Sequence, residues 1–230
     1  NLQEVGRQQL SGGGFIWNYA SFHLDDATQV LVGKITVNNK TIYAAVTHFH
    51  ASPPDLPEYR KLIAEYSETY GYSESESEKT KVLLTENQEW RNKEFTLLDE
   101  YLSEVVPAGE PLIVLGDFNA DSSWPEIKRF QNKGYLDTFA AVNKEPKYTW
   151  DANENQNIQT HYLKDLNQKR ATLYSHLDDT LTASRLTLDY IFTKSMNGPD
   201  SVVQSDLCAD SVINGVHPSD HFGVITELRL

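Results

Sequence analysis

The chain has 230 residues, a length that favours one α/β domain over two small ones and allows a sizeable core. Hydrophobic residues make up 39% and aromatic residues 11%, which excludes an intrinsically disordered chain. The net charge is −13, and this charge disfavours nucleic acid as a partner without excluding it, because backbone phosphates are bound by clustered lysines and arginines. No apolar run approaches the roughly 20 residues of a membrane-spanning helix. The single cysteine, Cys208, excludes an internal disulfide, but the sequence fixes neither the compartment nor the oligomeric state.

The first part of the chain predicts a β-hairpin. Residues 28–37 and 41–49 are rich in valine, isoleucine, threonine and tyrosine, and they flank Asn38-Asn39. This pattern predicts two strands joined by a tight turn. The second strand delivers His48 at its end, where a histidine is either a structural hydrogen-bonding residue or part of a site.

Two helices are predicted after the hairpin. Residues 56–72 and 85–105 carry apolar residues at helical spacing, and Pro107-Ala-Gly109 ends the second helix. The Ser-Glu repeat of residues 73–79 is polar and of low complexity, so we expect it to be an exposed loop. A strand, a long helix and then a buried strand indicate a helix packed on a sheet.

Residues 112–121 form the stretch around which the expected chemistry is arranged. The apolar residues 112–115 predict a buried strand, and Asp117, Asn119 and Asp121 follow at its end. A carboxylate and an amide two residues apart on an extended backbone point to the same side. They could therefore position a water molecule and hydrogen-bond a phosphate oxygen. The alternative is an Asp/Asn-rich turn without a function.

The second half of the chain adds a short helix, an irregular segment and three strands. Residues 124–133 predict the helix, and residues 143–185 lack clear periodicity. An irregular segment of about 40 residues is long for a compact domain, and such segments often shape binding sites. The three strands are expected within residues 187–192, within residues 201–213 and at the end of the chain.

A carboxylate at position 189 interrupts an apolar strand. A buried aspartate is costly unless it is paired, and a histidine held in one tautomer is a natural partner. Asp220-His221, in the loop before the last strand, supplies both such a histidine and a carboxylate of the kind that binds metals. Asp189, Asp220 and His221 are therefore expected to face one pocket.

Three motifs together resemble the endonuclease/exonuclease/phosphatase superfamily, also described as the deoxyribonuclease-I-like fold: Gly116-Asp-Phe-Asn119, Leu188-Asp-Tyr-Ile-Phe192 and Ser219-Asp-His221. Thr47-His48 is similar to the mid-chain histidine of the family, and Leu2-Gln-Glu-Val5 to the strand that carries its metal-binding glutamate. The resemblance implies one domain over residues 1–230 of the α/β (α+β) class. This domain would be a four-layer sandwich of two packed mixed β-sheets flanked by helices, with the first strand of the family missing before Asn1.

The resemblance also implies hydrolysis of a phosphate ester that depends on Mg²⁺, for which Mn²⁺ could substitute. Glu4 and Asp220 would help to hold the metal. Asp117 would orient or deprotonate the attacking water, and Asn119 would hydrogen-bond the phosphoryl group. His48 and His221, the latter oriented by Asp189, would bind non-bridging oxygens or shuttle a proton. The identity of the base stays open between Asp117 and His221.

The substrate class is predicted from a further motif. Tyr148-Thr-Trp-Asp151 and the Asn-rich turn after it are similar to neutral sphingomyelinases, which favours a small or lipid phosphodiester. A nuclease on DNA or RNA is the first alternative. The second alternative is a binding module that has lost turnover, and the complete set of site residues argues against it. Trp124 and Trp150 are candidates for contact with a lipid surface, with core packing as the alternative.

Overall fold

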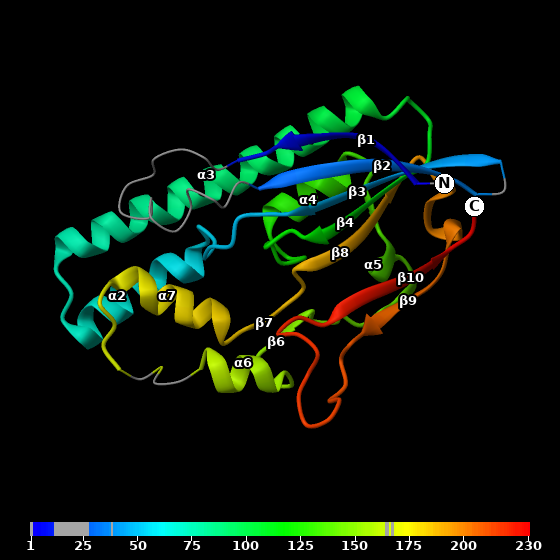
Figure 1. The fold of residues 1–230 in the computed structure, drawn as a ribbon. Helices are drawn as coiled ribbons and strands as arrows, with labels where there is room; N and C mark the ends of the chain where they lie inside the picture. Colours follow the sequence, from blue (N-terminus) through cyan, green and yellow to red (C-terminus); the bar gives the residue numbers. More distant parts are fainter. Residues whose placement is uncertain (1, 12–27, 38, 164–165, 167) are drawn as a thin grey trace.

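A computed structural model describes residues 2–11, 28–37, 39–163, 166 and 168–230. Its main sheet has the strand order β1-β2-β3-β4-β8-β5 (Figure 1). The strands are β1 (Leu2–Gln9), β2 (Gln29–Val37), β3 (Lys40–His48), β4 (Leu112–Asp117), β8 (Asp189–Lys194) and β5 (Leu136–Asp137). Only β3 and β4 run parallel in this sheet, and the other neighbours are antiparallel. The predicted hairpin is therefore present as β2 and β3, although Asn38 of its turn lies outside the described residues.

Two further sheets of two strands each lie beside the main sheet. One pairs β9 (Val202–Cys208) with β10 (Gly223–Leu228), and the other pairs β6 (Trp150–Asp151) with β7 (Arg185–Leu186). β10 contacts β8, and the short helix α5 (Thr138–Val142) lies against both β9 and β8. The expected α/β class, with packed sheets flanked by helices, is confirmed. Within the described residues the second packed sheet is much smaller than the first.

The long helix α3 (Glu74–Val105) and the short helix α4 (Pro125–Asn132) cover one face of the main sheet (Figure 1). The core between them is rich in phenylalanine rings that meet edge to face or stacked, and it includes Phe49, Phe95, Phe118, Phe130 and Phe192. Trp124 is also buried in this core, so its predicted contact with a lipid surface is wrong. The burial follows from apolar alternation in the strands and the apolar stripe of α3.

The N-terminal half of α3 packs against α2 (Pro57–Tyr70) and α7 (Leu173–Thr182), away from the sheet (Figure 1). These helices share a second apolar core, made of Tyr59, Ile63, Leu84, Leu173, Tyr174 and Leu177. Among the described residues, no helix combines the length and the apolar character required to cross a bilayer.

Two expectations about secondary structure are wrong. Residues 73–79 are not a loop, because Ser73 caps α3 by accepting a hydrogen bond from the amide of Glu76 at 3.2 Å, and glutamates occupy the first turn. The segment 143–185 contains α7 and the short helix α6 (Gln156–His161). The apolar residues of α7 become recognisable as a helical face only once α2 and α3 supply the surface that they contact.

Candidate active site

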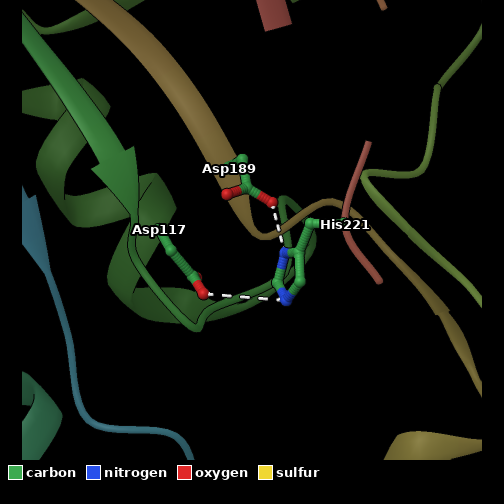
Figure 2. Close-up of side chains that lie close together, drawn as sticks. All are labelled: Asp117, Asp189 and His221. Carbon is green, nitrogen blue, oxygen red and sulfur yellow. Dashed lines mark hydrogen bonds and ion pairs between the residues drawn. The ribbon is translucent and has the colours of Figure 1, made fainter. Parts of the chain in front are cut away.

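Three of the predicted side chains converge where β4 ends and β8 begins (Figure 2). His221 Nδ1 lies 2.8 Å from Asp189 Oδ2, within hydrogen-bonding distance. On the other side of the ring, Nε2 lies 4.0 Å from Asp117 Oδ2. The imidazole is thus held between two carboxylates, and its Nε2 faces Asp117.

Strand pairing brings the two carboxylates together. Asp117 is the register partner of Asp189 in the antiparallel pair β4–β8, and of His48 in the parallel pair β3–β4. His48 Nε2 lies 3.5 Å from Asp117 Oδ2, and the His48 side chain is 71% exposed. Three neighbouring strands therefore present these side chains at one edge of the sheet, with His48 facing solvent.

Gly116 allows β3 and β4 to approach each other closely next to the site. Its φ is +143°, and a Cβ at this position would lie 1.8 Å from the carbonyl oxygen of Thr47. Any side chain would push the strands apart, so glycine is required at this position. The contact lies immediately before the pair of His48 and Asp117.

Asn119 lies in the turn after β4, where its φ of +45° is one that asparagine tolerates. Its backbone amide donates to Asp117 Oδ1 at 2.7 Å, and its side-chain amide donates to the carbonyl of Phe49 at 2.8 Å. Asn119 thus orients the Asp117 carboxylate and fastens the turn to the end of β3. The third polar residue of the motif, Asp121, accepts the backbone amides of Ser123 and Thr187 and has a structural role.

Burial and neighbouring charges change the protonation of the group. Burial, and next the Asp189 carboxylate, raise the pKa of Asp117 to about 6. Burial alone would lower the pKa of His221, but the hydrogen bond to Asp189 and the charges of the nearby carboxylates outweigh it and raise this pKa. Both pKa values are therefore raised, and a carboxyl with a raised pKa beside a histidine is typical of groups that act in acid–base catalysis.

Asp220 borders this group but is engaged elsewhere. Its Oδ2 accepts a hydrogen bond from the Tyr162 hydroxyl at 3.0 Å, and its Oδ1 accepts one from Ser219 Oγ at 3.2 Å. Burial would raise the pKa of Asp220, but the hydrogen bond from Tyr162 and the charge of His221 outweigh it, so this pKa is lowered. Asp220 is therefore a charged carboxylate next to the three clustered side chains.

The structure separates Glu4 from the site. The register through β2 and β3 places Glu4 level with Ile113, four residues before Asp117, or about 13 Å at the rise of an extended strand. Its side chain is 53% exposed and forms an ion pair with Arg7 at 3.0 Å. The structure therefore does not bring Glu4 to the clustered side chains, because β1 pairs with β2 and carries this residue away from the strand ends. Metal ligation by Glu4 stays a prediction.

Two residues that the sequence connected with the substrate, and not with the clustered side chains, contact the cluster or its neighbours. Thr149 Oγ1 accepts the backbone amide of Asp189 at 3.0 Å, and the Thr149 carbonyl accepts the amide of Phe222 at 2.7 Å. The Trp150 and His221 rings meet edge to face, with ring centroids 5.0 Å apart. The motif Tyr148-Thr-Trp-Asp151 was a usable signal for this contact, but its role becomes clear only from the fold.

The donor set fits a divalent cation that prefers oxygen ligands. Asp117, Asp189 and His221 offer ligand atoms that all lie within 4.8 Å of one another. Two carboxylates share one imidazole there, so negative charge is in excess, and a cation would offset it. Such an ion commonly takes one or two protein carboxylates and keeps waters or substrate oxygens as its other ligands.

The chain belongs to one known protein family. Residues 12–221 match a family model described as Endonuclease/Exonuclease/phosphatase family. No curated protein matches the chain. Among solved structures, D. rerio TDP2 complexed with single-strand DNA product covers the whole chain at 14% identity and a TM-score of 0.55, over 69% of its own chain.

Two bacterial structures are similar to the same degree. A functionally unknown conserved protein from Enterococcus faecalis V583 covers 99% of the chain at 17% identity and a TM-score of 0.55, over 67% of its own chain. A mannosyl-6-phosphatase from Bacteroides thetaiotaomicron covers 100% at 16% identity and a TM-score of 0.53, over 67% of its own chain. At these identities the likeness establishes the fold, and it leaves the substrate open.

Proposed function

Since the chain belongs to the endonuclease/exonuclease/phosphatase family, whose members hydrolyse phosphate esters, we propose that it is a metal-dependent phosphodiesterase acting on a small or lipid phosphodiester. The observation that carries the proposal is the imidazole of His221, which is hydrogen-bonded to Asp189 at one nitrogen and faces Asp117 with the other. This arrangement is that of a base with an orienting carboxylate, and it stands at the edge of the main sheet.

In this proposal the chain's own residues orient water and move a proton. With Nδ1 donating to Asp189, Nε2 of His221 accepts the proton of a water molecule that Asp117 orients. Geometry therefore favours His221 as the base, the choice that the sequence left open. The backbone amide of Asn119 fixes the Asp117 carboxylate, and a hydrogen bond from Asn119 to the phosphoryl group stays a prediction. The exposed His48 would bind a non-bridging phosphate oxygen.

The carboxylates of Asp117, Asp189 and Asp220 are the oxygen ligands proposed for Mg²⁺, with Mn²⁺ able to replace it. When bound, the ion would neutralise charge that develops on the phosphoryl oxygens and on the leaving group. Asp220 retains its predicted part in metal binding, and its lowered pKa keeps it charged at neutral pH.

A lipid substrate is supported by an exposed apolar turn between β9 and β10. Val212, Ile213 and Val216 are 45%, 58% and 57% exposed, around a tight turn in which Asn214 and Gly215 have positive φ. The loop extends beyond the strands on the side of β6 and α6 (Figure 1). Branched aliphatic side chains on a projecting turn suit contact with the boundary of a lipid surface.

The test measures Mg²⁺-dependent hydrolysis of three substrates by the same preparation: sphingomyelin vesicles, a single-stranded DNA oligonucleotide and a sugar phosphomonoester. We expect release of phosphocholine that Asp117→Asn abolishes and Asp206→Asn, an exposed control on β9, leaves unchanged. Cleavage of the oligonucleotide alone would favour a nuclease, an activity that the DNA product bound to the similar TDP2 structure makes worth testing. Hydrolysis unaffected by Asp117→Asn would exclude the mechanism.

A separate variant tests whether the turn between β9 and β10 contacts a lipid surface. Ile213→Ser removes apolar surface from the turn without touching the clustered side chains. We expect it to reduce hydrolysis of vesicles severalfold and to leave hydrolysis of the soluble diester bis(p-nitrophenyl) phosphate unchanged. Equal effects on both substrates would contradict a role at a lipid surface.

A further inference from the structure

A fully buried asparagine connects α6 to the loop that carries Asp220 and His221. The side-chain amide of Asn155 donates to the carbonyl oxygens of Ser219 at 3.0 Å and of Asp220 at 3.1 Å. Its side-chain oxygen accepts the backbone amide of Asn157 at 2.9 Å, which caps α6. One side chain thus has two separable tasks: its oxygen caps the helix, and its nitrogen holds the loop.

Further bonds join the same two segments. Asn157 Nδ2 donates to the carbonyl of His217 at 2.9 Å, and the amide of Gln156 donates to His217 Nδ1 at 3.2 Å. These contacts secure the beginning of the loop. Asn155 secures the two residues directly before His221, so its amide is the one closest along the backbone to the proposed base.

We propose that Asn155 is a positioning residue, whose amide fixes the backbone of Ser219 and Asp220 and thereby sets the positions of the Asp220 carboxylate and the His221 ring. The inference rests on the proposed function of this site. Asn155 contacts neither Asp117 nor the reacting groups directly, and it acts through the loop. The amide is suited to this task because it donates two bonds from one nitrogen to adjacent carbonyls, which no carboxylate can do.

The size of the expected effect follows from geometry. A carboxylate at this position would face two carbonyl oxygens, and repulsion would displace the loop. Misplacing a reacting group by about 1 Å can cost about 100-fold in rate. Because the displaced groups act on the water and the metal rather than on ground-state binding of the substrate, kcat should fall more than KM changes.

The chain offers a control with the same chemical change at an exposed position. Gln159 lies on the same short helix, and its side-chain amide also donates to two backbone carbonyls, those of Ala152 and Asn153 at 3.2 and 2.6 Å. Neither carbonyl belongs to the catalytic loop. Asn155→Asp and Gln159→Glu therefore make the same chemical change, and Asn155→Asp retains an oxygen that can still cap α6.

The experiment compares the two variants with the unmodified chain on bis(p-nitrophenyl) phosphate with Mg²⁺, and follows the His221 ring by nitrogen NMR. We expect Asn155→Asp to lower kcat about 10- to 100-fold, with KM within about threefold, and to shift the His221 ring resonances. Gln159→Glu should change neither. If Asn155→Asp does not fold, Asn155→Ala is judged by the same criteria, since it removes the donors without adding charge.

The inference is overturned if a folded Asn155 variant matches Gln159→Glu in kcat and leaves the His221 resonances in place. An unmodified chain that hydrolyses none of the substrates would contradict the proposed function instead. In that case the NMR comparison still decides whether Asn155 positions His221.

Discussion

Two groups of charged side chains with low exposure differ in how their charges are balanced. Arg91 and Glu126 connect α3 to α4, where Arg91 Nε lies 3.3 Å from Glu126 Oε1 and both side chains are fully buried. Arg91 also donates to the carbonyl of Ser52 at 2.8 Å. At the edge of the main sheet, Asp117 and Asp189 lie on either side of the His221 imidazole, and the three side chains are 11% to 25% exposed.

The difference separates a structural group from a candidate functional one. In the Arg91–Glu126 pair one positive charge lies against one negative charge, and the pair has a structural role because it connects α3 to α4. At the sheet edge two carboxylates lie close together, and burial, followed by the charge of Asp189, raises the pKa of Asp117 to about 6. An excess of one charge next to solvent creates affinity for a cation or a proton, which a balanced pair lacks.

The largest expected effect is on the structural pair. Arg91→Met leaves Glu126 buried without its counter-charge, so we expect the free energy of unfolding to fall by about 3–5 kcal/mol in urea titrations. The double variant Arg91→Met/Glu126→Leu should regain most of this loss, because no uncompensated charge remains. A loss below about 1 kcal/mol for Arg91→Met alone would show that the pair is not the balanced structural group described above.

At the sheet edge the corresponding change should affect turnover. Asp189→Asn removes the carboxylate that orients His221 and stabilises its protonated ring, so we expect kcat/KM to fall about 100- to 1,000-fold. Steady-state kinetics would show this loss, while thermal unfolding should show a small change. Asp206→Asn is the matched control, since its side chain is 68% exposed on β9. An unchanged kcat/KM would remove Asp189 from the mechanism.

The third prediction concerns stability at the site itself. Burial makes the charged form of Asp117 unfavourable in the folded state, and a tenfold change in proton affinity corresponds to about 1.4 kcal/mol. We therefore expect Asp117→Asn to raise the free energy of unfolding by about 1–3 kcal/mol at pH 7. The gain should vanish as the pH falls below about 4, where the carboxyl is neutral in both the folded and the unfolded state. Destabilisation at pH 7 would contradict an excess of negative charge at this site.

The smallest effect is a shift in pH dependence. Activity needs a charged Asp117 and a neutral Nε2 on His221, so kcat/KM should fall as the pH decreases, first through the raised pKa of His221 and then through the pKa of Asp117 at about 6. The Asp189 carboxylate raises the pKa of both groups. In Asp189→Asn both pKa values are lower, and the acid limb of the residual activity should move to lower pH. A limb that stays in place would show that other groups set these pKa values.

Much of the site could be predicted because its residues lie within local motifs. Asp117 follows an apolar run, Asp189 interrupts one and His221 precedes one, and a charged residue in such a place needs a partner. The position of Glu4 could not be predicted, for the opposite reason. A four-residue match says nothing about register, and the pairing of β1 with β2 decides how far this residue lies from the strand ends.

The remaining errors come from contacts between distant segments. Residues 73–79 contain a cap signal, Ser73 followed by Glu76, but the repetitive composition of the segment favoured a loop. Asn155 lies in an Asn-rich turn whose composition gave no reason to prefer one asparagine over another. Only the fold shows that the Asn155 side chain hydrogen-bonds the backbone of residues 219 and 220.

Gly116 has a consequence for how the site tolerates change. The atoms that a Cβ at Gly116 would meet belong to the backbone of Thr47, so the spacing of β3 and β4 at this point does not depend on the volume of any side chain. Repacking of the phenylalanine-rich core can therefore proceed without altering the separation of His48 and Asp117. The separation of His48 and Asp117 is thus set by the main chain, and substitutions in the core can accumulate without changing it.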